Sequence, residues 1–346
     1  MRILVIGGSG TFIGAHVVGE LTEMGHEVAV LSRREPPPSG VVRYIAGDRQ
    51  RLRELIQPLR AFKPDIVVDA ILSSGKQARD LIDVFGGVAA RIVALSSMDV
   101  YRACGVLHGS EPGPLETLPL TESSPVRTRL QTYPPAQIAM LQKIFGWLDD
   151  DYDKIPVERT LLASTELTAT ILRLPMVYGP GDKLHRFFPV VKRIDDSRPA
   201  IILSKPFVEW RGTKGFIDNV AAAVALAATS ERAAGRIYNV GEPDTLSELE
   251  WARLIADTAG WRGEFVVLPP DRVPAHLRQP ARFEQHWSAQ TTRIREDLGY
   301  RERVSREDAV RRTIEWERAN PPAQIDPRQF DYAAEDAVLA AASEES

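Results

Sequence analysis

The chain has 346 residues, of which 44% are hydrophobic and 26% are charged, and its formal net charge is −4. This length and hydrophobic content allow a large core divided between two lobes. The acidic balance makes nucleic acid an unlikely partner, because it gives no basic surface. The single cysteine, Cys104, excludes an intramolecular disulfide and is typical of a reducing compartment; we interpret it as a packed residue.

No apolar run reaches the roughly 18 residues that a membrane span requires, so we expect no membrane partner. Only Met1 and Arg2 precede the first apolar run, which leaves no room for a signal peptide. We therefore expect a cytoplasmic protein.

The first residues predict a βαβ unit. "RILVIGG" (2–8) is a short apolar run that ends in glycines, as buried parallel strands do. Residues 10–25 have helical spacing, and residues 26–32 return to strand character. Glycines at such a strand-to-helix turn let a pyrophosphate approach the N–H groups of the helix N-terminus. We therefore predict dinucleotide binding at this turn.

The end of the second strand distinguishes two dinucleotides. A carboxylate there would bind the ribose 2′-OH of NAD, whereas arginine accommodates the 2′-phosphate of NADP. This chain has Ser32, Arg33 and Arg34 at that place. Surface arginine pairs are often only solvated, but two guanidinium groups can bind a phosphate. We predict NADP as the cofactor, with NAD as the alternative.

Strands and helices continue to alternate along the first half of the chain. We expect a helix over 48–62 that is capped by Asp48, a strand over 64–71, a helix over 76–85 and a strand over 91–97. This alternation predicts an α/β fold with a doubly wound parallel sheet. Ligands bind at the carboxyl ends of such strands, so Ser96, Ser97 and the residues after Ala70 should lie near the nucleotide.

Several stretches, taken in order, resemble the extended short-chain dehydrogenase/reductase superfamily, which contains the NAD-dependent epimerase/dehydratase family and its nucleotide-sugar enzymes. They are "GGSGTFIG" (7–14), "SSMDVY" (96–101), "RLPMVYGPGD" (173–182), "GFIDNVAAAVALA" (215–227), "GRIYNVGE" (235–242) and "RIREDLGY" (293–300). The resemblance covers about residues 1–316. It implies a Rossmann domain over 1–178, to which part of 214–240 returns, and a smaller α/β substrate-binding lobe over 179–320. Residues 321–346 then form a linker and a C-terminal tail.

The resemblance also implies the site residues. The cofactor would be bound by Gly7, Ser9, Gly10, Thr11, Phe12, Ile13, Arg33, Arg34, Asp48, Ala70, Ser96, Lys154, Pro175 and Val177. Lys214 and Arg293 would bind the diphosphate of the substrate, and Ser97 would orient its reacting oxygen. His185, His276 and His286 lack metal-ligand spacing, so we predict no metal site.

The sequence departs from the family in the glycine turn and in the catalytic motif. The last glycine of the turn comes one residue late, at Gly14. Lys154 is followed by Glu158 as in the family, but Asp150 stands four residues before it, where the family has its catalytic tyrosine.

Tyr152 could replace the missing tyrosine. In a helix, residues two apart point to opposite sides, but in extended chain they share a face, and Pro156 favours extended chain before the helix. Tyr152 could then exchange the proton beside Lys154. Asp150 as the base, Tyr133 as the acid, or a site that has lost its proton-transfer group are the alternatives that the sequence leaves open.

The segment 126–149 is longer than the family usually has. Its helical spacing predicts a lid, a dimer-contact helix or an extra packing helix. We expect a homodimer that acts as an NAD(P)-dependent epimerase, dehydratase or reductase on a nucleotide-sugar-like substrate. The alternative is a non-catalytic dinucleotide-sensing or RNA-binding protein on the same fold, since "GGSGTFIG" also resembles the turn of plant chloroplast RNA-binding relatives.

Overall fold

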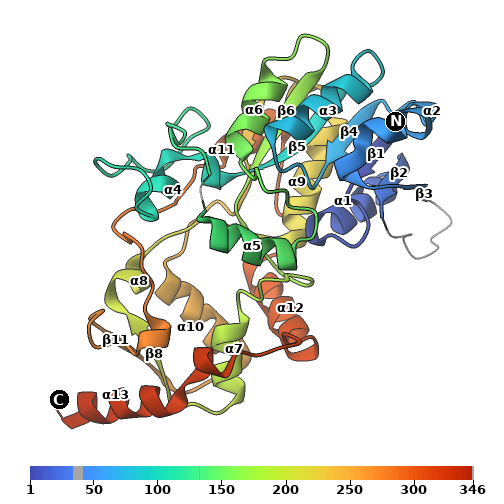
Figure 1. Cartoon of the computed structure of the whole chain (residues 1–346). Helices are drawn as coiled ribbons and strands as arrows, with labels where there is room; N and C mark the ends of the chain where they lie inside the picture. Colours follow the sequence, from blue (N-terminus) through green and yellow to red (C-terminus); the bar gives the residue numbers. More distant parts are fainter. Residues whose placement is uncertain (34–41, 132, 345–346) are drawn as a thin grey trace.

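The computed structural model describes residues 1–33, 42–131 and 133–344. Within these residues one parallel sheet has the strand order β10-β6-β5-β4-β1-β2-β3 (Figure 1). The chain starts in the middle of the sheet and winds outward in both directions, which confirms the predicted doubly wound topology. The strands are β1 (Arg2–Ile6), β2 (Glu27–Ser32), β3 (Val42–Ala46), β4 (Ile66–Asp69), β5 (Arg91–Ser97), β6 (Thr168–Leu174) and β10 (Ile237–Asn239).

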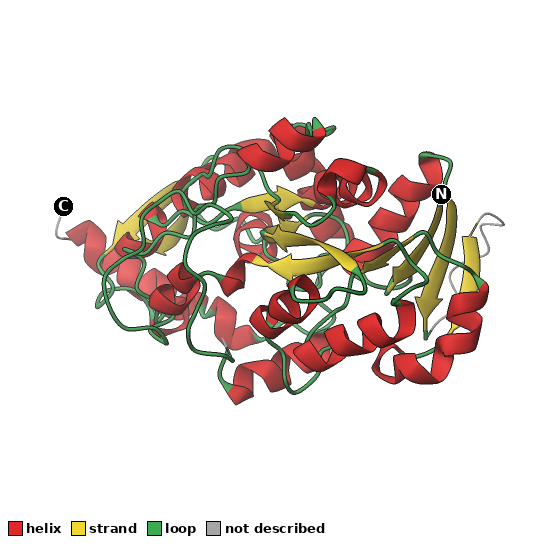
Figure 2. Ribbon diagram, turned by 90° about the horizontal axis from the view of Figure 1, so that it is seen from above, coloured by secondary structure: helices red, strands yellow, loops and turns green. Residues whose placement is uncertain are grey.

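Helices cover both faces of this sheet (Figure 2). On β1, Ile3 and Val5 belong to one hydrophobic core, whereas Leu4 and Ile6 belong to the other. α1 (Phe12–Glu23) and α9 (Ile217–Thr229) pack on the first face, and α3 (Gly75–Phe85) and α6 (Lys154–Leu162) pack on the second. Burial on both faces explains why the strands read as continuous apolar runs.

The second lobe contains two short parallel sheets and several helices. Its strand pairs are β8 (Ala200–Ser204) with β11 (Glu264–Leu268) and β7 (Met176–Tyr178) with β9 (Lys214–Phe216). Its helices are α7 (Phe188–Asp195), α8 (Lys205–Glu209), α10 (Glu248–Ala259) and α12 (Arg306–Ala319), whereas α11 (Thr292–Leu298) contacts β10 of the main sheet. The remaining helices of the described chain are α2 (Ile56–Ala61), α4 (Arg102–Leu107), α5 (Pro135–Ile144) and α13 (Tyr332–Glu344). None of the described helices is long and apolar enough to cross a membrane.

The C-terminal helix α13 lies against the second lobe (Figure 1). Glu335 of this helix is fully buried and accepts hydrogen bonds from Arg193 Nη2 at 2.6 Å and from His276 at 2.9 Å. The expected tail is therefore anchored by a buried carboxylate as far as the structure describes it.

Two elements differ from the sequence-based expectation. The helix expected over 48–62 is a 3-10 turn (Arg49–Leu55) followed by α2, because the backbone at Arg51 leaves the helical region at φ −116°. Asp48 nevertheless caps the turn as predicted, accepting the N–H of Gln50 at 2.9 Å. β3, which the sequence analysis did not identify, pairs in parallel with β2.

A buried ion pair joins α6 to the sheet. Arg173 on β6 donates to Glu158 on α6 at 3.1 and 2.7 Å, and both side chains are less than 10% exposed. Ser96 at the end of β5 donates to the same carboxylate at 2.5 Å. The guanidinium also lies 4.8 Å from the centroid of the Tyr101 ring. These contacts fix the first turn of α6 relative to the carboxyl ends of β5 and β6.

Replacing Glu158 by Ala should lower the free energy of unfolding by about 3–5 kcal/mol, because Arg173 would remain buried without its counter-charge. Glu315→Ala is the matched control: Glu315 pairs with Arg311 on the exposed surface of α12 and should cost less than about 1 kcal/mol. Urea unfolding of the dinucleotide-free protein measures both. Equal losses in the two variants would contradict the structural role of the pair.

Candidate active site

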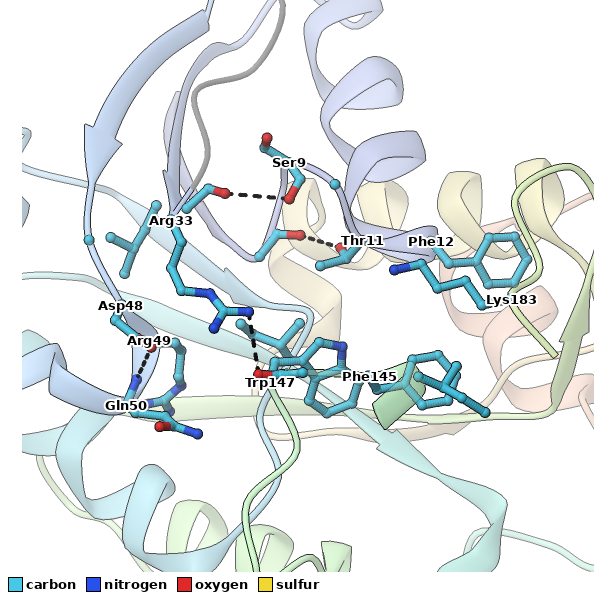
Figure 3. A pocket seen from close by; sticks show the side chains of 18 residues that line it. Ser9, Thr11, Phe12, Arg33, Asp48, Arg49, Gln50, Phe145, Trp147 and Lys183 are labelled. Atoms are coloured by element: carbon cyan, nitrogen blue, oxygen red, sulfur yellow. Dashed lines mark hydrogen bonds between the residues drawn. The ribbon is translucent and has the colours of Figure 1, made fainter. Parts of the chain in front are cut away.

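A cavity of about 530 Å³ lies where β1 gives way to α1 (Figure 3). The predicted residues Gly7, Ser9, Gly10, Thr11, Phe12, Arg33 and Asp48 all line it. Arg34 lies outside the described residues, so its predicted role stays a prediction.

The glycine turn has the conformation that a pyrophosphate cradle needs. Gly7 and Gly10 have φ of 78° and 70°, in the left-handed region that favours glycine. A Cβ on Gly14 would lie 2.1 Å from the carbonyl oxygen of Gly7. Gly14, although one residue later than in the family motif, therefore still allows α1 to pack directly on the turn. The extra residue lies between Gly10 and Gly14. The residues present fit a dinucleotide at this place.

Part of the 126–149 segment forms the opposite wall of this cavity. Figure 3 shows Phe145 and Trp147 facing the turn that carries Ser9 and Thr11. Arg33 reaches across and donates to the carbonyl of Gly146 at 3.3 Å. Helix α5, which precedes this stretch, buries none of its residues. These contacts favour the lid interpretation over the packing-helix interpretation.

A second, inner cavity of about 250 Å³ continues from the first, because the two share Thr11, Phe12, Ile71, Phe145 and Trp147. The inner cavity is lined by the other predicted residues of the first lobe, namely Ile13, Ala70, Ser96, Ser97, Tyr152, Lys154, Pro175 and Val177. Residues predicted from separate motifs thus meet around one connected space.

Tyr152 and Lys154 lie side by side in the inner cavity. α6 begins at Lys154, and its N-cap Asp153 is extended, with φ −161° and ψ 129°. The two side chains therefore share a face, and Lys154 Nζ lies 5.7 Å from the centroid of the Tyr152 ring. The same ammonium donates to the carbonyl oxygens of Leu72 and, at 3.0 Å, Leu95. Of the two geometries considered from the sequence, the structure has the extended one.

Sequence analysis missed Asp99, which contacts both candidate tyrosines. Tyr152 donates its hydroxyl hydrogen to Asp99 Oδ2 at 3.0 Å, and Tyr133 approaches the same oxygen at 3.5 Å. The two rings stack with their centroids 6.2 Å apart. Asp99 is 1% exposed, and its Oδ1 has no hydrogen-bond partner among the described residues. The available signal was its place in "SSMDVY", two residues after Ser97, whose Oγ accepts the N–H of Asp99 at 3.1 Å.

Burial controls the protonation of this group of residues. Burial raises the pKa of Asp99 above its ordinary value, although Arg127 and Lys154 oppose the shift. Burial and the charge of Asp99 raise the pKa values of Tyr152 and Tyr133 well above 10. Burial lowers the pKa of Lys154 to about 8, against the attraction of Asp99. At neutral pH Tyr152 is therefore a proton donor rather than a phenolate.

Two other candidates lie away from this chemistry. Asp150 is exposed and accepts a hydrogen bond from Gln142 at 2.8 Å, and it does not line the inner cavity. Cys104 is buried, and burial raises the pKa of its thiol well above the usual value, as expected for a packed residue.

The two predicted substrate cations are engaged elsewhere. Lys214 pairs with Glu248 and lies 5.1 Å from the Trp251 ring centroid. Arg293 Nε lies 3.5 Å from a carboxylate oxygen of Glu122. Neither residue lines the cavities around Tyr152 that the described residues form. Lys183, which the sequence analysis did not single out, does line the dinucleotide cavity, beside Phe12 (Figure 3).

Parts of the chain are similar to known proteins. Residues 3–80 match the model of the "NAD dependent epimerase/dehydratase family". The match covers the first strands and the glycine turn and does not extend to the second lobe. A dTDP-glucose 4,6-dehydratase of Streptomyces niveus is 36% identical over 87 residues, which are 25% of this chain and 24% of that relative. The matched segment thus spans about a quarter of the relative's length.

Several solved structures share the fold of nearly the whole chain. A dTDP-glucose 4,6-dehydratase of Bacillus anthracis in complex with NAD has a TM-score of 0.65 at 14% identity, covering 93% of this chain and 97% of that one. A UDP-glucose 4-epimerase of Thermus thermophilus in complex with NAD has a TM-score of 0.60 at 22% identity, covering 92% and 100%. The second lobe therefore also has the architecture of these proteins.

The lowered pKa of Lys154 makes stability depend on pH. Between about 8 and the usual 10.5, the unfolded chain binds a proton at Lys154 that the folded protein does not, so the free energy of unfolding rises with pH. The side chain in Lys154→Met cannot titrate. Over this pH range the free energy of unfolding of the wild type should therefore increase by about 3 kcal/mol relative to that of Lys154→Met. Urea unfolding of dinucleotide-free protein at several pH values tests this. A difference that stays constant would contradict the burial of a titrating amine.

Proposed function

We propose that this protein is a nicotinamide-dependent oxidoreductase of the epimerase/dehydratase type. It would transfer hydride to or from the carbon of a secondary alcohol or ketone on a sugar-like small molecule. The observation that carries the proposal is the pairing of Tyr152 with Lys154 in a cavity that is continuous with the dinucleotide cradle. The names of the relatives, which refer to dTDP-glucose and UDP-glucose, support a sugar as the reacting group.

The first cavity would hold the cofactor. The turn at Gly7 and Gly10 and the N-terminus of α1 would bind the pyrophosphate, and Lys183 would add a positive charge beside it. When bound, the nicotinamide ring supplies the acceptor or donor of hydride. Arg33 supports NADP as the cofactor, because it lines the cavity at the end of β2, where Ser32 and not a carboxylate precedes it.

The proton would move through Tyr152 and Asp99. When a substrate hydroxyl hydrogen-bonds to Tyr152 Oη, its proton can pass to that oxygen while the tyrosine's own proton passes to Asp99 Oδ2. No separate phenolate has to form, which suits a tyrosine whose pKa is raised by burial and by Asp99. In the reverse direction Asp99 returns the proton to Tyr152, and Tyr152 protonates the substrate oxygen. Asp99 takes part because burial also raises its own pKa.

The neighbouring residues would position the substrate and exclude water. Ser97 Oγ caps the turn that carries Asp99 and would donate its hydrogen to the same substrate oxygen. Phe145 and Trp147 line both cavities, so they would cover the reacting atoms on the side away from the sheet.

A dinucleotide-sensing or RNA-binding protein without turnover is the alternative that the sequence left open. A gel shift with RNA, run beside a nicotinamide absorbance assay, separates the two. The homodimer and the cytoplasmic location stay predictions.

Calorimetry should detect binding of NADP(H). Arg33→Ala should weaken NADP(H) binding about tenfold and leave NAD(H) binding nearly unchanged, because only NADP carries the 2′-phosphate. Arg311→Ala on exposed α12 is the control. A protein that binds neither dinucleotide would end the proposal, and equal losses for both would remove Arg33 from phosphate recognition.

Tyr152→Phe should reduce hydride transfer by about two to four orders of magnitude, since the proton-transfer group is gone, and leave the Kd of the cofactor intact. The assay is reduction of bound NADP⁺ by a panel of sugars, nucleotide sugars and glycosides. Asp99→Asn should cause a loss of similar size and should shift the pH profile, whereas Tyr332→Phe on α13 should have no effect. An active Tyr152→Phe variant would exclude the proposed role.

A further inference from the structure

A third cavity, of about 700 Å³, lies between the two lobes and touches the reacting centre through Tyr133, which lines both it and the inner cavity. The other lining residues among those described are Leu107, His108, Ser110, Leu130, Gln131, Pro134, Pro135, Gln137, Met176, Phe207, Trp210, Gln279, Pro280, Ala281, Phe283 and Trp287. We call this space the outer cavity. A substrate whose alcohol lies at Tyr152 would extend into it.

None of the described side chains that line the outer cavity is an acid, a lysine or an arginine. Its one titratable base is His108, and burial lowers the pKa of His108 below its ordinary value, so the imidazole is neutral at pH 7. The described part of the cavity wall therefore supplies no counter-charge for an ionic ligand.

Aromatic rings form the wall on the side of the second lobe. The ring centroids of Phe207 and Phe283 are 5.3 Å apart, and those of Trp210 and Phe283 are 6.1 Å apart. The two indole N–H groups are already used, since Trp210 donates to the carbonyl of Gln285 at 3.0 Å and Trp287 donates to that of Met98 at 2.9 Å. What these rings offer a ligand is hydrocarbon surface, which favours a flat apolar group.

The cations closest to the reacting centre are also occupied. In the inner cavity, Lys154 is bonded to main-chain carbonyls, and Arg186 pairs with Asp182 at 2.7 Å. Moving a diphosphate from water into a space without free positive charge is strongly unfavourable. The observations therefore point away from a nucleoside diphosphate in the outer cavity.

We propose that the outer cavity binds an uncharged aromatic group joined to the alcohol-bearing ring, so that the substrate class is a neutral aryl glycoside or a similar aryl-substituted polyol. This inference rests on the proposed function only for the part of the substrate that lies at Tyr152. The binding of the aromatic group depends on the cavity wall alone.

Calorimetry on protein saturated with NADP(H) tests the proposal, with phenyl β-glucoside, 2-naphthyl β-glucoside and UDP-glucose as the probes. Both aryl glucosides should bind at least ten times more tightly than UDP-glucose, the naphthyl compound more tightly than the phenyl one, and with little dependence on salt. UDP-glucose binding at least as tightly as the aryl glucosides, or no binding of the aryl glucosides, would overturn the proposal.

Substitutions of Phe207, with one control variant, test whether the ligand binds at the aromatic wall of the outer cavity. Phe207→Ala, at a partly exposed position of α8, should weaken naphthyl glucoside binding about tenfold, whereas Phe265→Ala, an aromatic residue of β11 outside the cavity, should not change it. Phe207→Arg should reverse the preference toward UDP-glucose by adding the missing positive charge. Equal affinity in wild type and Phe207→Ala would place the ligand elsewhere and refute the assignment. Failure of the proposed function would be distinct: it would appear as absent NADP(H) binding before any glucoside is added, or as absent hydride transfer while the aryl glucosides still bound to the NADP(H)-saturated protein.

Discussion

The ion pair between Arg173 and Glu158 is the constraint on which the site depends. It joins β6 to α6, and Ser96 adds the end of β5 to the same carboxylate. Because α6 starts only four residues before Glu158, fixing this carboxylate also fixes Lys154 under the ends of β4 and β5. A buried pair of this kind contributes little net stability compared with an apolar substitute, but it tolerates no loss of one partner. It acts here as a positioning device.

The buried carboxylate of Asp99 favours the protonated form of Tyr152 instead of the phenolate. A cation beside a tyrosine favours the phenolate, whereas Asp99 at 3.0 Å favours the neutral phenol. Lys154 is buried, and burial moves its pKa toward neutrality instead of strengthening its positive charge. In the proposed mechanism, concerted movement of two protons would therefore be favoured over the formation of a stable anion. Tyr133, stacked on Tyr152, adds a second phenol to the same carboxylate.

The sequence predicted well whatever depends on local pattern. The parallel strands and the glycine turn follow from apolar runs and from glycines at a strand end, and the cavity positions of Thr11, Ser97 and Val177 follow from the family resemblance. Pro156 favoured extended backbone before α6, and the extended conformation at Asp153 explains why Tyr152 lies beside Lys154. Contacts between distant segments could not be predicted in this way. The pairing of Lys214 with Glu248 and the approach of Tyr133 to Asp99 each depend on how separate loops fold over the sheet.

The contact between Arg33 and Gly146 has a kinetic consequence. It connects the rim of the Rossmann sheet to the stretch that carries Phe145 and Trp147, so the cradle is bridged across its opening. A dinucleotide bound in this cavity would be released more readily once this bridge opens, and the same two aromatic side chains also border the space around Tyr152. Slow exchange of the dinucleotide would favour reactions in which it takes hydride from the substrate and returns it within one catalytic cycle. Net consumption of reduced nucleotide from solution would be limited by the opening of that bridge.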